Sequence, residues 1–201
     1  MSIILKDTEN QSLRPSKTAI DTVVIHFTGS NNGEGTVSWF RNPMSKVSAH
    51  FVIDRSGQIY QFVPEKHKAW HAGKSSWKGR KNVNNFSIGI ELVGISTQLF
   101  TEEQYESLIG ILRKLRIAFD IKEENVIGHE HVSPGRKVDP GRYFDWLRVY
   151  SGVYNNGEPK KAYFNKTITP TDVKFFKIPK GKDPVLDNFL ERVQKLFSSQ
   201  E

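Results

Sequence analysis

The amino-acid sequence predicts an α/β domain, in which a central mixed β-sheet is flanked by helices, followed by a C-terminal extension. Two observations predict this fold class: β-branched segments alternate with helical ones, and neither an internal repeat nor a low-complexity block interrupts them. With 201 residues, the chain has room for one domain of about 100–200 residues and an appendage. We therefore place the domain in residues 1–155 and the extension in residues 156–201.

Three β-branched segments are expected to supply strands of the sheet. Residues 22–27 (TVVIHF) form the first of them, and His26 should lie at its end. In residues 87–93 (SIGIELV), apolar residues alternate with glycine and Glu91, which turns the carboxylate away from the apolar face. A short strand over residues 125–128 completes the set.

Turn and cap signals predict a hairpin and a long helix. Residues 50–63 (HFVIDRSGQIYQFV) consist of two alternating runs around Asp54-Arg-Ser-Gly57, where the glycine can adopt positive φ. Residues 101–119 begin with Thr101-Glu-Glu-Gln104, which matches a capping box. The apolar residues of this helix recur at three- and four-residue spacing and should cover the sheet: Tyr105, Leu108, Leu112, Leu115 and Phe119.

The C-terminal part of the chain is expected to be less regular. Two Pro-Gly pairs exclude a regular helix from residues 129–142, which should form a structured loop before a last domain helix near residues 143–150. The extension contains a hairpin-like stretch at residues 161–178 and an amphipathic helix that begins at Asp183-Pro184. Because about fifty residues seldom sustain an independent core, we expect the extension to dock on the domain.

Composition narrows the classes of partner. The 29 Lys and Arg residues exceed the 22 acidic ones, and the formal charge of +7 favours polyanions such as nucleic acid, anionic glycopolymers or membrane surfaces. No basic run or nucleic-acid motif is present, which argues against nucleic acid. The absence of cysteine excludes thiolate metal sites. We expect no transmembrane segment, since no apolar run approaches about 20 residues, and no signal peptide.

Candidate metal ligands lie where strand ends meet loops. His26 ends one strand, while His129 and Asp139 share a loop that would let both side chains converge on one ion. Two histidines and one carboxylate form a set that catalytic zinc uses, with a fourth position left for water. On spacing alone, the commoner alternative is that His26 is a hydrogen-bonded structural residue.

Two further charged residues are candidates for catalysis. Glu91 is the natural general base for a metal-activated water. Lys137 lies two residues before Asp139, and Pro140 favours extended geometry there, so the lysine could stand beside the metal. On the residues alone, the commoner alternative is that Glu91 and Lys137 are surface charges or an ion pair.

Five segments carry a family resemblance. They are VVIHFTGS, VSAHFVIDRSGQIYQFV, AWHAGKSSWKGR, NNFSIGIELVG and VIGHEHVSPGRKVDPG, and together they span roughly residues 20–147. In order and spacing they resemble the type 2 N-acetylmuramoyl-L-alanine amidase family, which includes the AmpD and AmiD enzymes, phage lysozyme-type amidases and peptidoglycan recognition proteins. The resemblance implies a peptidoglycan recognition protein-like amidase fold. It also implies zinc-dependent hydrolysis of the amide bond between N-acetylmuramic acid and L-alanine.

The resemblance assigns roles to individual residues. His26, His129 and Asp139 resemble the ligands of one zinc ion. Glu91 resembles the catalytic carboxylate of the AmpD and AmiD branch, and Lys137 resembles the lysine that stabilises the oxyanion. These assignments imply an enzyme and not a non-catalytic peptidoglycan-binding module.

Residues for substrate binding also follow from the resemblance. His50 and His71 match positions that line the peptide groove, and each is either substrate-facing or structural. Arg80 and Asn85 lie before the Glu91 strand, where their side chains could hydrogen-bond the stem peptide. The expected substrate is therefore peptidoglycan or a muropeptide.

Three hypotheses describe the biological setting. The phage lysozyme-type members have a tyrosine before the hairpin histidine and a cysteine as third ligand, whereas this chain has Ala49 and Asp139 and looks closer to the glutamate-dependent branch. The basic charge and the extension favour an endolysin-like role in cell-wall lysis, with anionic wall polymers as possible partners. The alternatives are a cytoplasmic enzyme that recycles anhydro-muropeptides and the mature form of an enzyme whose leader has been removed.

Overall fold

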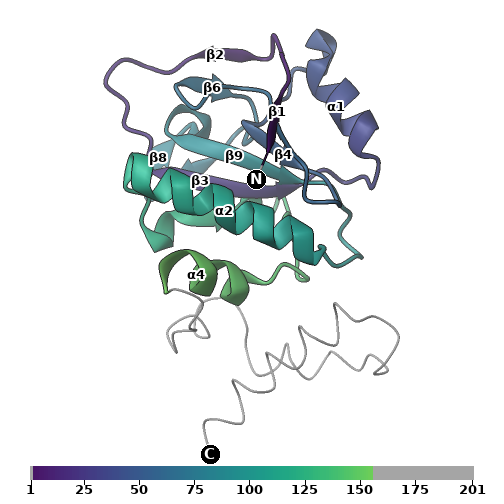
Figure 1. Ribbon diagram of the computed structural model, residues 1–201. Coiled ribbons are helices and arrows are strands. Elements are labelled where there is room, and N and C mark those ends of the chain that lie inside the picture. The colour runs from purple at the N-terminus through teal and green to yellow at the C-terminus, as the bar shows by residue number, and fades with distance from the viewer. Residues whose placement is uncertain (1, 156–201) are drawn as a thin grey trace, which may run out of the picture. The chain divides into compact units, whose positions relative to one another are not determined.

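The structure, a computed structural model, describes residues 2–155 (Figure 1). Two compact units divide the chain, residues 1–144 and a segment that begins at Asp145. The first unit is built on a six-stranded sheet with strand order β1-β5-β4-β9-β3-β10. Its strands are β1 (Ile3–Leu5), β3 (Thr22–Phe27), β4 (Phe51–Ile53), β5 (Ile59–Gln61), β9 (Ser87–Leu92) and β10 (Val126–Gly128).

The sheet is mixed, as the sequence predicts. β4, β9, β3 and β10 run parallel to one another, whereas β5 pairs antiparallel with β4 and parallel with β1. The predicted hairpin is confirmed, and Gly57 in its turn has a φ of +80°. A Cβ at this glycine would lie 2.7 Å from the backbone oxygen of Glu103, so both conformation and space require glycine.

One face of the sheet is covered by the long helix α2 (Glu102–Phe119), which runs roughly along the direction of β3 and β9 (Figure 1). The predicted capping box at its start is present, since Thr101 Oγ1 accepts from the Gln104 backbone and the Gln104 side chain accepts from the Thr101 backbone. Gln104 Nε2 then donates to the carbonyls of Ile53 and Val93 at the ends of two strand segments. The helix buries Tyr105, Leu108, Ile111, Leu112 and Leu115.

The opposite face carries the polar residues of the strands. His26 on β3 and Glu91 on β9 are paired in register, so their side chains leave the sheet on the same face. Helix α1 (Gly33–Arg41) flanks this face, and its buried Phe40 packs against Phe62 with ring centroids 5.5 Å apart. A second apolar cluster consists of Val24, Ala72, Val83, Phe86, Ile127 and Val132.

Short elements that the sequence analysis did not predict complete the first unit. Two small antiparallel ladders join β2 (Gln11–Leu13) to β6 (His67–Ala69) and β7 (Ser76–Trp77) to β8 (Arg80–Lys81). Arg14, which follows β2, donates to the carbonyls of Glu65, Asn84, Asn85 and Ser87 at 2.8–3.0 Å. This guanidinium therefore ties the N-terminal segment to the chain around β9. Single 3₁₀ turns are η1 (Pro43–Ser45), η2 (Val83–Asn85) and η3 (Glu123–Asn125).

The second unit begins with helix α4 (Trp146–Tyr154), which is capped by Asp145 through a hydrogen bond from the Arg148 backbone. The sequence predicts this helix near residues 143–150, so the observed helix starts and ends later. The expected docking of residues 156–201, with their hairpin-like stretch and helix, lies outside the described residues. Within residues 2–155, none of the helices is long and apolar enough to span a membrane.

Candidate metal centre and active site

The carboxyl ends of two parallel strands position the candidate ligands. His26 is the fifth residue of β3, and the neighbouring strand β10 ends at Gly128, so His129 follows immediately beside it. Ligand sites in sheets of this kind commonly form at the carboxyl ends of parallel strands. Strand pairing therefore brings together two histidines that are 103 residues apart.

The loop after β10 returns Asp139 to the same place. The sequence analysis predicts only a structured loop here, but the structure begins it with one helical turn, α3 (His129–Val132). The Glu130 backbone N–H then donates to the Asp139 carbonyl at 3.0 Å, which closes the loop. Gly128 makes room for this closure, because a Cβ there would lie 2.6 Å from Cδ of Pro140.

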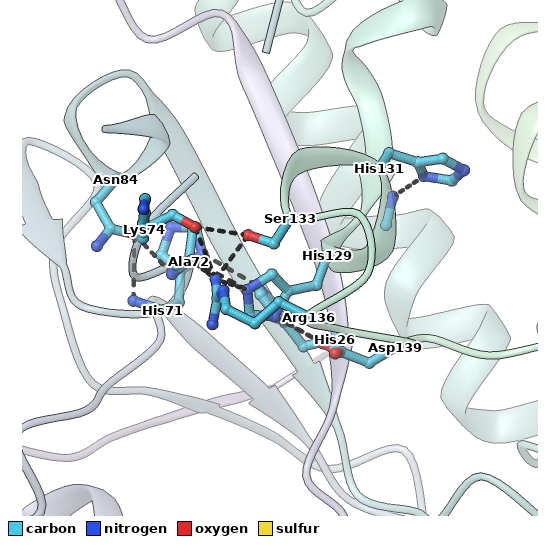
Figure 2. Close-up of polar contacts among 11 residues, drawn as sticks. His26, His71, Ala72, Lys74, Asn84, His129, His131, Ser133, Arg136 and Asp139 are labelled. Atoms are coloured by element: carbon cyan, nitrogen blue, oxygen red, sulfur yellow. Dashed lines mark hydrogen bonds and ion pairs between the residues drawn. The ribbon is translucent and has the colours of Figure 1, made fainter. Parts of the chain in front are cut away.

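His26, His129 and Asp139 converge on one point (Figure 2). His26 Nδ1 lies 2.9 Å from His129 Nδ1 and 2.9 Å from Asp139 Oδ2, and His129 Nδ1 lies 3.0 Å from the same oxygen. The side chains are buried, with 1%, 3% and 7% of the three residues exposed. Two imidazole nitrogens and a carboxylate oxygen thus form a nearly equilateral triangle.

The proton positions show that this triangle fits a cation. His129 Nε2 lies 3.1 Å from the Ala72 carbonyl, which only accepts, so the ring proton is on Nε2 and Nδ1 presents a lone pair. Burial lowers the pKa of His26 to about 4, so this ring is neutral at neutral pH. Ligand atoms of a tetrahedral zinc site lie about 3.3 Å apart at bonds of about 2.0–2.1 Å. Small outward movements of the three side chains would provide that spacing.

A pocket of about 460 Å³ opens beside the three ligands, and Glu91 and Lys137 line it together with them. Glu91 is partly exposed to the pocket, yet its Oε2 is buried and has no hydrogen-bond partner within the described chain. A buried carboxylate oxygen without a partner is poised to bind a water or a substrate group. The pocket is also lined by Trp39, which is 54% exposed and which the sequence analysis did not select.

In the absence of a metal ion, electrostatics favour the protonated form of Glu91. Burial, and secondarily the negative charge of Asp139, raise the pKa of Glu91 to about 8, although Lys137 opposes the shift. Burial also favours protonated Asp139, but the contacts of Asp139 with His129 and His26 prevail and lower its pKa. The two carboxylates thus differ in proton affinity, as expected for a proton acceptor beside a metal ligand.

The shifted pKa of Glu91 predicts how pH affects the stability of the zinc-free protein. Because the folded state holds this proton more tightly than the unfolded state, whose pKa is 4.5, stability falls as pH rises from there to about 8. Glu91→Gln removes this loss. Above pH 8, the free energy of unfolding of the zinc-free variant should therefore exceed that of the zinc-free wild type by an amount on the order of several kcal/mol. Denaturant unfolding of both proteins at pH 5 and pH 9 measures the difference, and an equal difference at both pH values would contradict the assignment.

The predicted substrate-binding residues lie in different surroundings. His71 lines the pocket. His50 is fully buried: its Nδ1 accepts from the Gly89 backbone and its Nε2 contacts the His67 carbonyl, so its contacts fit the structural alternative. Arg80 forms a bidentate ion pair with Asp21 at the surface, and neither Arg80 nor Asn85 lines the pocket.

Residues behind the ligands were not identified from the sequence. Arg136 Nη2 donates to the carbonyls of Ala72 and Lys74 and to Ser133 Oγ, which holds the loop after β10 against the chain that follows β6 (Figure 2). Ser133 Oγ donates to the Lys74 carbonyl at 2.9 Å. These partners are about sixty residues apart in sequence, so no local pattern reveals them.

Comparisons with known proteins agree with this geometry. The family model for N-acetylmuramoyl-L-alanine amidase matches residues 16–142. The 1,6-anhydro-N-acetylmuramyl-L-alanine amidase AmpD of Salmonella typhimurium is 40% identical over 139 residues, which cover 69% of this chain and 74% of the relative. A crystal structure of an AmpD derivative superposes with a TM-score of 0.70 at 34% identity and covers 75% of this chain and 94% of that structure.

A further solved structure contains a ligand. It is the amidase AmiD from Escherichia coli in complex with anhydro-N-acetylmuramic acid-L-Ala-D-γ-Glu-L-Lys, with a TM-score of 0.63 and 30% identity over 69% of this chain and 60% of that structure. With these likenesses, the cluster of His26, His129 and Asp139 is a zinc site. The chain belongs to the N-acetylmuramoyl-L-alanine amidase family and is an enzyme of that activity.

Proposed function

We propose that this amidase acts on soluble anhydro-muropeptides in the cytoplasm, as a recycling enzyme. The observation that carries the proposal is the 40% identity to AmpD, whose name specifies the 1,6-anhydro form of the muramyl sugar. The AmiD complex supports it, because its bound substrate also has an anhydro-muramyl end. The sequence analysis favours wall lysis, but these likenesses support its alternative better.

In the proposed reaction, water attacks the lactyl carbonyl of the muramyl group and the bond to the L-alanine nitrogen breaks. Bound zinc would supply positive charge that polarises the carbonyl, acidifies water and favours ionised Glu91. Glu91 takes the proton of the attacking water and returns it to the leaving nitrogen. Lys137 stabilises the negative charge that develops on the former carbonyl oxygen.

The residues around the pocket are suited to these steps. Glu91 Oε2 has no hydrogen bond to give up, so proton transfer costs no protein contact within the described chain. Lys137 is exposed at the pocket, and its charge acts on both Glu91 and His26. The volume of about 460 Å³ accommodates a sugar and the first residues of a peptide, in the range of about 300–1,000 Å³ typical of small-molecule sites.

Wall lysis remains the second candidate, because the formal charge of +7 favours anionic wall polymers. The recycling role and the lytic role differ in the substrate that the enzyme should cleave. We expect the enzyme to release peptide from soluble anhydro-N-acetylmuramyl-tripeptide and to leave the turbidity of intact sacculi unchanged at the same concentration. Chromatography of released peptide and turbidity readings provide the two measurements, with metal-free enzyme as the blank. Clearing of sacculi at a comparable rate per amide bond would favour the lytic role.

A further inference from the structure

A buried chain of hydrogen bonds extends from the zinc ligand His26 into the protein. His26 Nε2 lies 3.0 Å from His71 Nδ1, and His71 Nε2 lies 3.1 Å from Ser87 Oγ. Ser87 Oγ lies in turn 2.7 Å from the Val83 carbonyl oxygen. Ser87 is fully buried and His71 is 9% exposed.

The last hydrogen bond of this series, from Ser87 to Val83, determines the position of every proton in the series. A carbonyl oxygen only accepts, so the single hydroxyl proton of Ser87 is committed to Val83. Ser87 Oγ must then accept from His71, which places the ring proton of His71 on Nε2. The buried ring of His71 contacts His26 and Ser87 and forms no ion pair with a carboxylate among the described residues. Because a buried charge without a counter-ion is costly, the ring is neutral and its Nδ1 accepts. His26 Nε2 therefore carries the proton that it donates to His71.

We propose that His71 and Ser87 are positioning residues that hold His26 in the tautomer whose Nδ1 binds zinc. The Nδ1 atom is the one that faces His129 and Asp139. If His71 carried its proton on Nδ1, His26 would have to accept at Nε2 and carry its own proton on Nδ1. That proton would point at Asp139 and occupy the position required by the ion.

The second histidine ligand shows why Ser87 is needed. His129 donates from Nε2 to the Ala72 carbonyl, an acceptor that cannot reverse its role. His26 instead donates to an imidazole, which can either accept or donate at Nδ1. Because Ser87 donates its hydroxyl proton to the Val83 carbonyl, it must accept from His71 Nε2, and His71 Nδ1 can then only accept. Strand β9 thereby supplies both Glu91 and the group that orients a metal ligand.

The backbone of β9 is shaped to admit the His71 ring. A Cβ on Gly89 would lie 2.4 Å from Cγ of His71 and 2.7 Å from its Nδ1, closer than atoms of a real structure approach. The ring therefore lies directly against the strand, between His26 and Ser87. This close fit accounts for a glycine two residues before Glu91.

Zinc affinity tests the proposal, independently of the substrate and hence of the proposed recycling role. The dissociation constant is measured by competition with a chromophoric chelator in the full-length chain. Ser87→Ala should weaken zinc binding by about 10–100-fold, the effect typical of lost partners of metal ligands. Ser75→Ala is the matched control: Ser75 is also buried, donates to the Gly73 carbonyl and accepts from the Val83 backbone, but does not contact His71. Its zinc affinity should equal that of the wild type.

Substitutions of His71 test whether Ser87 acts through it. His71→Ala should weaken zinc binding at least as much as Ser87→Ala, and adding Ser87→Ala to it should cause no further loss. His71→Asn should restore much of the affinity, because its amide oxygen corresponds in position to Nδ1 and accepts without a choice of tautomer. In the His71→Asn background, Ser87→Ala should have little effect.

Two results would overturn the proposal. One is a zinc dissociation constant of Ser87→Ala equal to that of Ser75→Ala. The other is an additive loss when Ser87→Ala is combined with His71→Ala or His71→Asn. If His71→Ala does not fold, the comparison of His71→Asn with and without Ser87→Ala decides alone, and the visible spectrum of the Co²⁺-substituted protein reports whether the ligand set is retained.

Discussion

Glu91→Gln should lower kcat by on the order of 10²–10⁴-fold, the contribution of a positioned general base, while the chain keeps its zinc. The amide has the shape of the carboxylate but cannot take a proton from water. Glu91 lies outside the cluster of His26, His129 and Asp139, so zinc content should not change. Release of L-alanyl peptide from anhydro-muropeptide gives kcat, and elemental analysis gives the zinc content.

Glu130→Gln provides the matched control. Glu130 is half-buried, feels the same Asp139 charge, but does not line the pocket. This control removes an equal charge near the metal and should leave kcat close to that of the wild type. If Glu91→Gln instead turns over substrate at a near-normal rate, another group is the base. Equal losses in both variants would indicate a general effect of charge.

The sequence predicted those parts of the fold that have local signals. The β-branched run of β3, the turn around Gly57 and the capping box at Thr101 each act over a few residues, and all three are present. The two small ladders and helix α1 were missed because they are short, and α1 also contains two glycines, Gly33 and Gly35. Their strands have only two or three residues each, too few for a recognisable pattern.

The residues of the site likewise fall into those that the sequence could predict and those that it could not. The ligands His26, His129 and Asp139 could be predicted because the quoted segments carry the resemblance and the strand ends suggest convergence. The surroundings of His50 and His71 could not, since the partners that fix each ring come from distant segments. His50 contacts the Gly89 backbone 39 residues away, and His71 contacts His26 at a separation of 45 residues. The roles of Glu91 and Lys137 stay predictions.

Asp139→Ala should abolish both activity and the zinc-dependent part of the stability. Its Oδ2 is the only anionic member of the cluster and lies within 3.0 Å of both ligand nitrogens. Without it, two neutral imidazoles remain, one ligand fewer than the three that catalytic zinc sites use. We expect the purified variant to contain little zinc and to show no measurable amide hydrolysis.

Thermal melts with and without a chelator measure the stability part. A ligand at 100–1,000 times its Kd stabilises a folded protein by about 2.7–4.1 kcal/mol. For a chain of this size, that corresponds to a Tm increase of about 5–15 °C. The wild type should therefore lose this increment on chelation, whereas Asp139→Ala should melt at the same temperature in both conditions.

Asp21→Ala is the control for the loss of an aspartate. Asp21 forms an ion pair with Arg80 outside the pocket, with 35% of its side chain exposed, and an exposed pair of this kind contributes about 0–1 kcal/mol. This variant should keep its zinc, its activity and its response to the chelator. A chelator-sensitive Tm in Asp139→Ala, with wild-type zinc content, would mean that the ion is held by other groups. If the chelator does not change the Tm of the wild type, zinc contributes nothing to folding, and the buried triangle of ligands is equally stable without its ion.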